Sequence, residues 1–202
     1  SAVLERSDER VEFVARRGEI LGFGGLQGQG QLDTLGALFG LGGSRNMLVS
    51  VAGESAKISH PRDAMSAGIA MVPDNRIQYG VFSGRTVREN LTVSTLESRS
   101  RFGVVDRTSE AEAVRKSIEK LSVRLSSPDQ PIESLSGGNM QKVVVGRWLL
   151  FNPRVVIALE PTQGIDVGTK QQLYALLRQL ADEGIVVLLY TTDMLELVGL
   201  CN

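Results

Sequence analysis

Two short apolar runs with no charged residue constrain the fold of this chain most strongly. They cover Val155–Leu159 and Ile185–Tyr190. A strand that is apolar along its whole length is buried on both faces, as in a parallel sheet covered by helices. Stretches with helical spacing lie around both runs, at Met140–Leu150, Lys170–Leu180 and Met194–Leu200. This alternation predicts an α/β core with a mostly parallel sheet and helices on both faces.

The first third of the chain repeats this order. Glu19–Gly24 is a short, mainly apolar run, a glycine-dense turn follows it, and Leu32–Phe39 has helical spacing. Strand, glycine loop and helix in this order are typical of a P-loop nucleotide-binding unit. Ile69–Val72 predicts another strand, and the apolar residues of Leu48–Val51 predict a small antiparallel β lobe.

A mostly helical stretch separates the two halves of the predicted core. The pattern from Thr86 to Leu125 is helical, and a possible capping box at Ser109–Glu112 predicts a helix over Ala111–Leu125. Ser126–Ser134 contains two prolines and is interpreted as a linker. We expect one domain over residues 1–202, interpreted as a fragment of something longer. Its helical lobe spans approximately 81–134, and its α/β core approximately 18–40, 68–80 and 135–202.

Composition excludes several classes of function. The net charge is −1 and aromatic residues make up 5% of the chain, which argues against a nucleic-acid surface. The single cysteine, Cys201, cannot form an internal disulfide, so a reducing compartment is expected. The apolar runs are too short to span a bilayer, and no secretory signal opens the sequence.

The segment LSGGNMQ precedes the helix predicted over Met140–Leu150. Two glycines allow close approach of the backbone to a ligand, and a helix N-terminus favours phosphate. Taken alone, a Ser-Gly-Gly turn that merely caps a helix would be the better explanation. The residues concerned are Leu135, Ser136, Gly137, Gly138, Asn139 and Gln141.

The turn does not stand alone. Leu159-Glu160-Pro161-Thr162 follows directly after a buried strand, and Gly164-Ile165-Asp166 comes next. The order and spacing of these pieces resemble the ABC ATPase family: signature motif, helix, Walker B strand and D-loop. The resemblance covers essentially the whole chain.

A narrower resemblance is to the second ATPase half of monosaccharide importers of the ribose, xylose and galactose type. Three stretches carry it: Gly18–Gly22, Gly68–Arg76 and Gln163–Gly168. It implies a P-loop NTPase core that binds ATP and Mg²⁺. It also implies a second nucleotide-binding domain, fused N-terminally, and membrane permease subunits as partners.

The phosphate loop departs from the family pattern. Its glycines match at Gly25, Gly28 and Gly30, but Gln31 stands at the lysine position and Leu32 at the Ser/Thr position. Lysine neutralises phosphate charge and the hydroxyl ligates Mg²⁺. A leucine cannot bind a hard cation. The loop, which also contains Gln27 and Gln29, is therefore expected to keep its backbone N–H groups while it lacks charge and a metal ligand.

Three further positions depart from the same pattern. Leu159 stands where the Walker B strand ordinarily ends in aspartate, although Glu160, the candidate general base, remains. Asp74 occupies the Q-loop glutamine position, and Thr192 occupies the switch-histidine position. Little or no hydrolysis is therefore expected from the isolated domain, with ATP and Mg²⁺ weak or absent at its own site.

ABC ATPases work as head-to-tail pairs, in which each composite site takes its signature motif from the opposite half. The resemblance thus implies that Ser136, Gly137 and Gly138 complete a partner's site, while the chain's own phosphate loop forms a degenerate one. The implied activity of the full complex is that of an ATP-driven translocase that imports a small solute, expected to be a monosaccharide. The chain is expected at the cytoplasmic side of the membrane.

Two alternative functions share parts of this pattern. A DNA-repair ATPase shares the signature but needs a long coiled coil, and no sustained heptads are present. The second alternative is a non-hydrolysing regulatory module. It differs from the main interpretation only in whether the partner's ATP site needs this signature. His60 is interpreted as a solvated loop residue rather than a metal ligand, and Trp148 as core packing rather than an adenine platform. Phe13 is interpreted as an ordinary strand residue rather than an adenine platform. Arg76 either contacts the permease or forms a surface ion pair.

Overall fold

The computed structural model describes residues 2–6, 9–26, 28–42, 47–101 and 103–201. They form two compact units. The first comprises Ser1–Met71, Pro153–Glu160 and Leu177–Asn202, and the second comprises Val72–Asn152 and Pro161–Leu176. Each unit is described by itself.

The core of the first unit is a four-stranded sheet in the order β3-β10-β9-β6. These strands are Ile20–Phe23, Val186–Tyr190, Val155–Leu159 and Ile69–Val72. β10 pairs in parallel with both of its neighbours. The last four residues of β9 and of β10 are buried, as expected for strands that are apolar along their length. The predicted α/β class with a parallel sheet is confirmed.

The register of this sheet aligns the ends of three strands. Phe23, Tyr190 and Leu159 are paired neighbours across β3, β10 and β9. In a parallel sheet the carboxyl ends meet at one edge, where ligands of α/β proteins bind. The segments after these three residues therefore begin at the same edge of the sheet.

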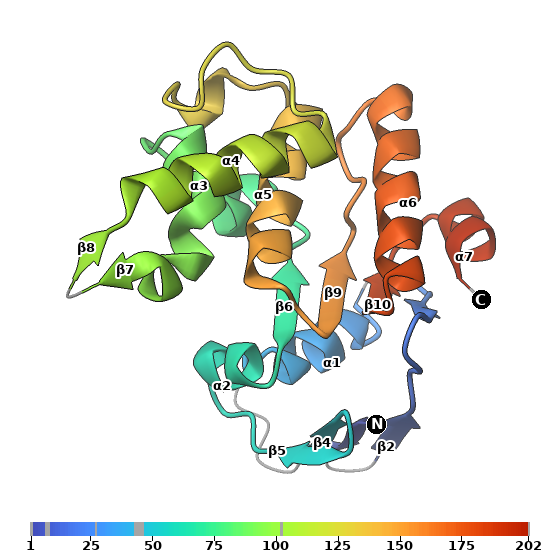
Figure 1. The fold of residues 1–202 in the computed structure, drawn as a ribbon. Helices are drawn as coiled ribbons and strands as arrows, with labels where there is room; N and C mark the ends of the chain where they lie inside the picture. The colour runs from blue at the N-terminus through green and yellow to red at the C-terminus, as the bar shows by residue number, and fades with distance from the viewer. Residues whose placement is uncertain (1, 7–8, 27, 43–46, 102, 202) are drawn as a thin grey trace. The chain divides into compact units, whose positions relative to one another are not determined.

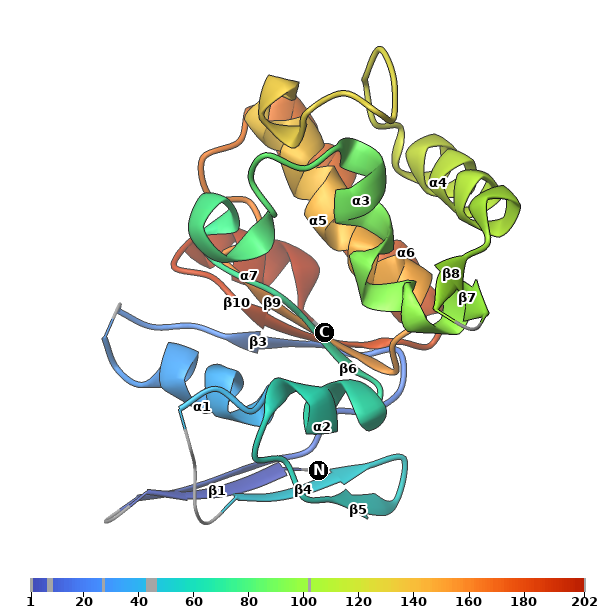
Figure 2. The ribbon, with the colours of Figure 1, turned by 90° about the vertical axis from the view of Figure 1, so that its left-hand side faces the viewer.

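A small antiparallel sheet of order β2-β1-β4-β5 completes the first unit, together with three helices. Helices α1 and α2 lie between the two sheets (Figures 1 and 2). The small antiparallel sheet is thus confirmed. Its strands are Ala2–Arg6 (β1), Glu9–Phe13 (β2), Met47–Val51 (β4) and Glu54–Ala56 (β5); the helices are Gln31–Leu38 (α1), Pro61–Ser66 (α2) and Met194–Leu200 (α7).

The second unit is mainly helical, with one two-stranded ribbon. Its longer helices are Val87–Thr92 (α3), Arg107–Leu121 (α4), Gly137–Phe151 (α5) and the first part of Val167–Asp182 (α6). The short elements are a π-helix Arg76–Gly80 (η1), 3-10 turns Val93–Thr95 (η2), Glu97–Arg99 (η3) and Ile132–Ser134 (η4), and strands Ser100–Arg101 (β7) and Val104–Val105 (β8).

Gly146 allows three helices of the second unit to meet. A Cβ on Gly146 of α5 would lie 2.6 Å from Leu121 Cδ1 of α4 and 2.9 Å from Leu91 Cδ2 of α3. Any side chain at this position would push the neighbouring leucines away. The glycine therefore permits α3 and α4 to pack closely against α5.

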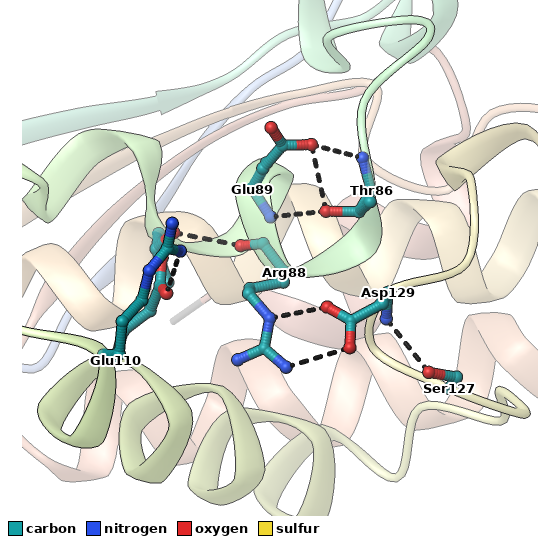
Figure 3. A network of polar contacts seen from close by, with 8 residues as sticks. Thr86, Arg88, Glu89, Glu110, Ser127 and Asp129 are labelled. Carbon is teal, nitrogen blue, oxygen red and sulfur yellow. Dashed lines mark hydrogen bonds and ion pairs between the residues drawn. The ribbon is translucent and has the colours of Figure 1, made fainter. Parts of the chain in front are cut away.

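Polar contacts at the start of α3 fix it to the segment after α4 (Figure 3). Thr86 and Glu89 form a reciprocal capping box at its N-terminus. Arg88 donates from Nε to Asp129 Oδ1 at 2.7 Å and from Nη2 to Oδ2 at 3.2 Å. Asp129 in turn donates its N–H to Ser127 Oγ, so the paired carboxylate is itself held in place.

Three predicted helix boundaries are wrong. α4 ends at Leu121 rather than Leu125, because Ser122 adopts a left-handed conformation and caps it. α4 begins at Arg107 rather than Ala111, because Asp106 accepts hydrogen bonds from the N–H groups of Thr108 and Ser109 and caps the helix earlier. α5 begins at Gly137 rather than Met140, because Ser136 is its N-cap. None of the described helices is long and apolar enough to cross a membrane.

Candidate nucleotide-binding site

The phosphate loop connects β3 to α1 in the first unit. Gly25, Gly28 and Gly30 have φ values of 139°, 89° and 93°, a region that side chains with a Cβ rarely adopt. Gly30 is the N-cap of α1, so the loop ends at a helix N-terminus. The conformation therefore depends on the three glycines that the family pattern places here. Gln27, which also belongs to this loop, lies outside the described residues.

Two glutamine side chains bond to the backbone of this loop. Gln29 Oε1 accepts the backbone N–H of Leu26 at 3.0 Å, and Gln31 Nε2 donates to the carbonyl oxygen of Gly24 at 3.1 Å. A Cβ on Gly25 would lie 2.7 Å from Gln29 Oε1 and would also collide with Gln31 Nε2. Uncharged amides thus bond to the backbone of the loop, and one of them, Gln31, stands where the family pattern has a lysine.

Glu160 follows β9 with a left-handed φ of 41°. Its backbone N–H donates to the carbonyl of Tyr190 at 2.8 Å, which ties the end of β9 to β10. A left-handed residue with a bulky side chain stores strain, which is common at functional sites. Leu159, just before it, is buried at the end of the strand.

The carboxylate of Glu160 contacts the segment after β10. Oε1 accepts the backbone N–H of Thr192 at 2.8 Å. The hydroxyl of Thr191 lies 3.4 Å from Glu160 Oε2 and 2.9 Å from Glu196 Oε2. Because a hydroxyl donates only one hydrogen, the shorter contact makes Glu196 its better acceptor. The register of the sheet thus brings the Walker B and switch-histidine positions into hydrogen-bond contact.

The signature segment forms the N-terminus of α5 in the second unit. Ser136 Oγ accepts from the N–H of Asn139 at 3.4 Å and from its Nδ2 at 2.9 Å. Asn139 Oδ1 accepts the backbone N–H of Arg124 at 2.8 Å, which holds the asparagine in place. Within the described residues no hydrogen bond uses the Ser136 hydroxyl hydrogen, so it can be donated to a ligand. Leu135 and Gln141 are buried on either side.

Gly138 brings the start of α5 close to the start of α6. A Cβ on Gly138 would lie 2.6 Å from Cγ2 and 2.7 Å from Oγ1 of Thr169. Asp166 accepts from Thr169 Oγ1 at 2.7 Å and from its N–H at 2.9 Å, and these hydrogen bonds lower the pKa of the Asp166 carboxyl. The D-loop aspartate therefore holds the first turn of α6 against the signature glycine.

Arg76, in the π-helix η1, contacts the D-loop. Nη1 donates to the carbonyl of Gln163 at 2.6 Å and Nη2 to the carbonyl of Gly164 at 3.0 Å. Among the described residues the acceptors of Arg76 are main-chain carbonyls and not a carboxylate. Sequence reasoning had no signal for this role, since the acceptors lie 87 and 88 residues away and main-chain oxygens are common to every residue type.

The remaining predicted residues are placed as follows. Asp74 Oδ1 accepts the N–H of Asn75 at 2.8 Å, at the start of the segment that leads into η1. Phe13 packs edge-to-face on Phe23, with ring centroids 5.1 Å apart. It therefore serves as a strand residue that packs against the parallel sheet's first strand.

His60 and Trp148 have structural surroundings. His60 is the N-cap of α2, where its Nδ1 accepts the N–H of Arg62 at 3.2 Å. Trp148 packs edge-to-face on Phe151, one turn further along α5. Across the described residues, no group of three His, Cys, Asp or Glu side chains is placed to hold a metal ion.

The site residues divide between the two units. The phosphate loop, Leu159, Glu160 and Thr192 belong to the first unit. Asp74, Arg76, the signature and the D-loop from Gln163 to Asp166 belong to the second. Each unit thus contains one group of the predicted site residues, and the hydrogen bonds described above join residues within the same unit.

Ribose and xylose import ATP-binding proteins align with most of this chain. It is 44% identical over 194 residues to the ribose import ATP-binding protein RbsA 1 of Rhizobium johnstonii, covering 95% of this chain and 38% of the relative. It is 41% identical to the xylose import ATP-binding protein XylG of Burkholderia ambifaria, covering 95% and 37%. With RbsA of Bacillus subtilis the identity is 35%, covering 100% and 41%. The chain thus spans about two fifths of the length of these relatives.

Solved structures share the fold at low sequence identity. A nucleotide-free ATP-binding cassette from an ABC transporter superposes with a TM-score of 0.80 at 18% identity, covering 98% of this chain and 82% of that one. An ATP-binding cassette dimer in a post-hydrolysis state, bound to ADP and phosphate, superposes with a TM-score of 0.76 at 20% identity, covering 96% and 86%. The model of the ABC transporter family matches residues 9–163. By this match and by its relatives, the chain belongs to the ABC transporter family as an ATP-binding domain.

Proposed function

We propose that this chain is the signature-donating half of an ATPase pair that drives import of a sugar. Its Ser136, Gly137 and Gly138 complete an ATP site whose phosphate loop and catalytic carboxylates come from a partner domain. Its own phosphate loop forms a degenerate site with little or no hydrolysis. The signature and the phosphate loop of this chain are therefore assigned to two different ATP sites.

The single observation that carries the proposal is the contrast between the two half-sites. The signature half is intact and ordered: Ser136 caps α5, its hydroxyl hydrogen is available, and Asn139 is held by Arg124. In the phosphate-loop half the uncharged side chains of Gln29 and Gln31 bond to the loop's own backbone. A phosphate site needs donors and positive charge; the signature half presents the Ser136 hydroxyl, whereas the phosphate loop lacks its lysine and has one backbone N–H, that of Leu26, bonded to Gln29.

The residues around the phosphate loop do not fit Mg²⁺. The ion takes hard oxygen ligands in near-octahedral geometry. Leu32 and Leu159 stand where the family has its hydroxyl and its aspartate, and neither carries an oxygen on its side chain. Glu160 alone remains, with Oε1 bonded to the N–H of Thr192. No step of hydrolysis is therefore assigned to this site.

The proposed solute and partners follow from the relatives. The relatives named for ribose and xylose import are 35–44% identical to this chain over the aligned residues. The chain covers only about two fifths of their length. The remaining three fifths leave room for a second nucleotide-binding domain, fused to the N-terminal side. Permease subunits in the membrane would carry the sugar, and this chain would lie on their cytoplasmic side. A helical lobe over approximately 81–134 inserted in an α/β core remains our proposed division of the domain.

The experiment compares two single variants of the full-length protein assembled with its permease. Ser136→Ala removes the signature hydroxyl and is expected to lower ATP turnover at least about tenfold, as for other lost transition-state donors. Glu160→Gln removes the carboxylate of the degenerate site and should leave turnover within about twofold. Arg115→Ala, on the exposed face of α4, is the matched control.

The opposite pattern would overturn the proposal. If Glu160→Gln abolishes turnover and Ser136→Ala does not, this chain hydrolyses ATP at its own phosphate loop. If neither variant changes turnover, the chain is a regulatory module. Uptake of labelled pentoses and hexoses by the same complexes in proteoliposomes tests the solute class, since sugar import predicts ATP-dependent uptake that Ser136→Ala reduces in parallel with turnover.

A further inference from the structure

Arg76 joins two segments of the second unit that are far apart in the sequence. Its guanidinium donates to the carbonyls of Gln163 and Gly164 in the D-loop, at 2.6 and 3.0 Å. The same group lies against the first residue of α5: a Cβ on Gly137 would be only 2.8 Å from Nη2 and 3.6 Å from Cζ. The arginine thus lies where the D-loop and the signature meet.

Glycines lie on both sides of this guanidinium. Gly164 has a left-handed φ of 66°, and a Cβ there would lie 3.5 Å from Nη2. At Gly137 a Cβ would collide with Nη2, so the planar head of Arg76 occupies the space that a side chain would need. The two glycines accommodate the arginine, which explains why the signature can approach the D-loop so closely.

The guanidinium is positioned by carbonyl oxygens and not by a carboxylate. Nε is buried without a hydrogen-bond partner in the described part of the chain. Burial lowers the pKa of Arg76, as expected for a cation that loses water. A buried polar atom without a partner costs stability, so the arrangement is not explained by stability alone. A fork of donors that fixes two consecutive carbonyls is a task for which arginine is suited and lysine is not.

We propose that Arg76 is a positioning residue that holds the D-loop, residues 163–166, against the signature at the start of α5. Asp166 and Thr169 hold the other end of the same loop beside Gly138. The D-loop is thereby fixed at both ends, and the signature is presented as one rigid surface. The consequence for ATP turnover rests on the proposed function, because the signature then acts on a partner's nucleotide.

Hydrogen exchange of the full-length protein tests the positioning directly. In Arg76→Ala, peptides covering 161–168 and 135–142 should exchange at least about fivefold faster than in wild type, because the D-loop has lost two of its anchoring donors. In Arg76→Lys the exchange rates of these peptides should lie between those of wild type and of Arg76→Ala, since an ammonium lacks the planar fork. Arg115→Ala, whose guanidinium pairs only with Glu119 on α4 among the described residues, should leave both peptides unchanged.

Unchanged exchange in these two peptides for Arg76→Ala would overturn the proposal. If Arg76→Ala accelerates exchange everywhere, the domain has unfolded and Arg76→Lys decides instead. Acceleration confined to the two peptides in the lysine variant supports positioning, and no acceleration in them overturns it.

Kinetics of the full-length protein with its permease test the link to the signature. Arg76→Ala should lower kcat about tenfold while KM for ATP stays within about twofold, because the signature closes on nucleotide that the partner has already bound. Combined with Ser136→Ala, it should cause no further loss, since both variants disable the same surface. Independent, additive losses would overturn the link.

The two failures are distinguishable. If Ser136→Ala reduces turnover and Arg76→Ala does not, the role of Arg76 in catalysis is refuted and the proposed function stands. If Ser136→Ala has no effect, the proposed function is refuted, while hydrogen exchange still decides whether Arg76 positions the D-loop.

Discussion

Gln29 Oε1 accepts the backbone N–H of Leu26 at 3.0 Å, across the turn of the phosphate loop. Backbone N–H groups of such loops are the donors that cradle phosphate. In this chain the side chain of the loop itself takes one of them. Gln31 Nε2 in addition donates to the carbonyl of Gly24, so two side chains of the loop bond to its own backbone. The loop thus carries no lysine, and one of its backbone donors already has a side-chain acceptor.

The first prediction concerns release of this side-chain contact. Gln31→Lys restores a positive charge but leaves Gln29 in place, so we expect only a modest gain in ATP affinity. Gln29→Ala combined with Gln31→Lys frees the N–H of Leu26 as well, and should lower the dissociation constant at least about tenfold further, which corresponds to about 1.4 kcal/mol. Isothermal titration with ATP measures this, with the exposed Gln171→Ala as control. Equal affinity of the single and double variants would show that Gln29 does not obstruct the loop.

The second prediction concerns the metal. Gln31→Lys, Leu32→Thr and Leu159→Asp together return the charge and both hard oxygen ligands, so ATP affinity should become Mg²⁺-dependent. Each restored charge-assisted contact should contribute about 1.5–3 kcal/mol. Leu159 is 6% exposed at the end of β9, so an aspartate should lower Tm without metal and recover it with Mg-ATP. Turnover should additionally need a partner's signature and Thr192→His.

A clear outcome would refute this assignment of positions. If the triple variant folds with normal secondary structure and binds Mg-ATP no better than wild type, Gln31, Leu32 and Leu159 do not belong to the phosphate and metal site. The variant with Leu159→Asp alone serves as the control, since it carries the folding cost without the restored lysine.

The third prediction concerns Asn90, which is fully buried in the helical unit. Its main-chain carbonyl accepts a hydrogen bond from Arg147 Nε. Its side-chain Oδ1 accepts from Arg147 Nη2 and from the N–H of Phe82. Burial lowers the pKa of Arg147 to about 10, so this guanidinium is still charged at neutral pH. Asn90→Ala leaves Arg147 and Phe82 short of acceptors and should lower the free energy of unfolding by about 2–4 kcal/mol.

Urea unfolding followed by the fluorescence of Trp148, the only tryptophan, measures this change. The control is Asn75→Ala, which removes an exposed helix cap and should cost about 1 kcal/mol or less. Similar losses for the two variants would contradict the importance of the buried asparagine network.

The fourth prediction concerns the pH dependence of stability. The hydrogen bond from Arg88 holds the pKa of Asp129 below its ordinary value of 3.8. A carboxyl whose pKa is lower in the folded state contributes stability above the unfolded pKa and loses it as the pH falls through the folded pKa. Arg88→Ala should therefore lower Tm at pH 6 and have a progressively smaller effect below pH 3.8.

Because the Asp129 side chain is 64% exposed, the effect should be small and should shrink further in high salt. Asp129→Asn should reproduce the loss at pH 6, and the double variant should add little to either single one. A constant Tm difference between wild type and Arg88→Ala from pH 6 to pH 2 would show that the pair contributes only packing.

The sequence by itself determined the parallel sheet and the identity of the site segments. β9 and β10 follow from runs with no charged residue, because only strands covered on both faces can bury every side chain. The departures at Gln31, Leu32 and Leu159 are also complete in the sequence, since they depend on which atoms each side chain carries. Helix starts were less certain: Asp106 and Ser109 are both good caps, and local preference did not choose between them.

Only the tertiary structure decided which atoms within the site contact one another. The bonds of Arg76 to Gln163 and Gly164 join segments 87 and 88 residues apart through main-chain oxygens, which carry no sequence signal. The contact of Glu160 with Thr192 depends on the register of β9 against β10. Periodicity shows that a strand is buried, but pairing is fixed by long-range packing, and so contacts at the strand ends appear only in the folded chain.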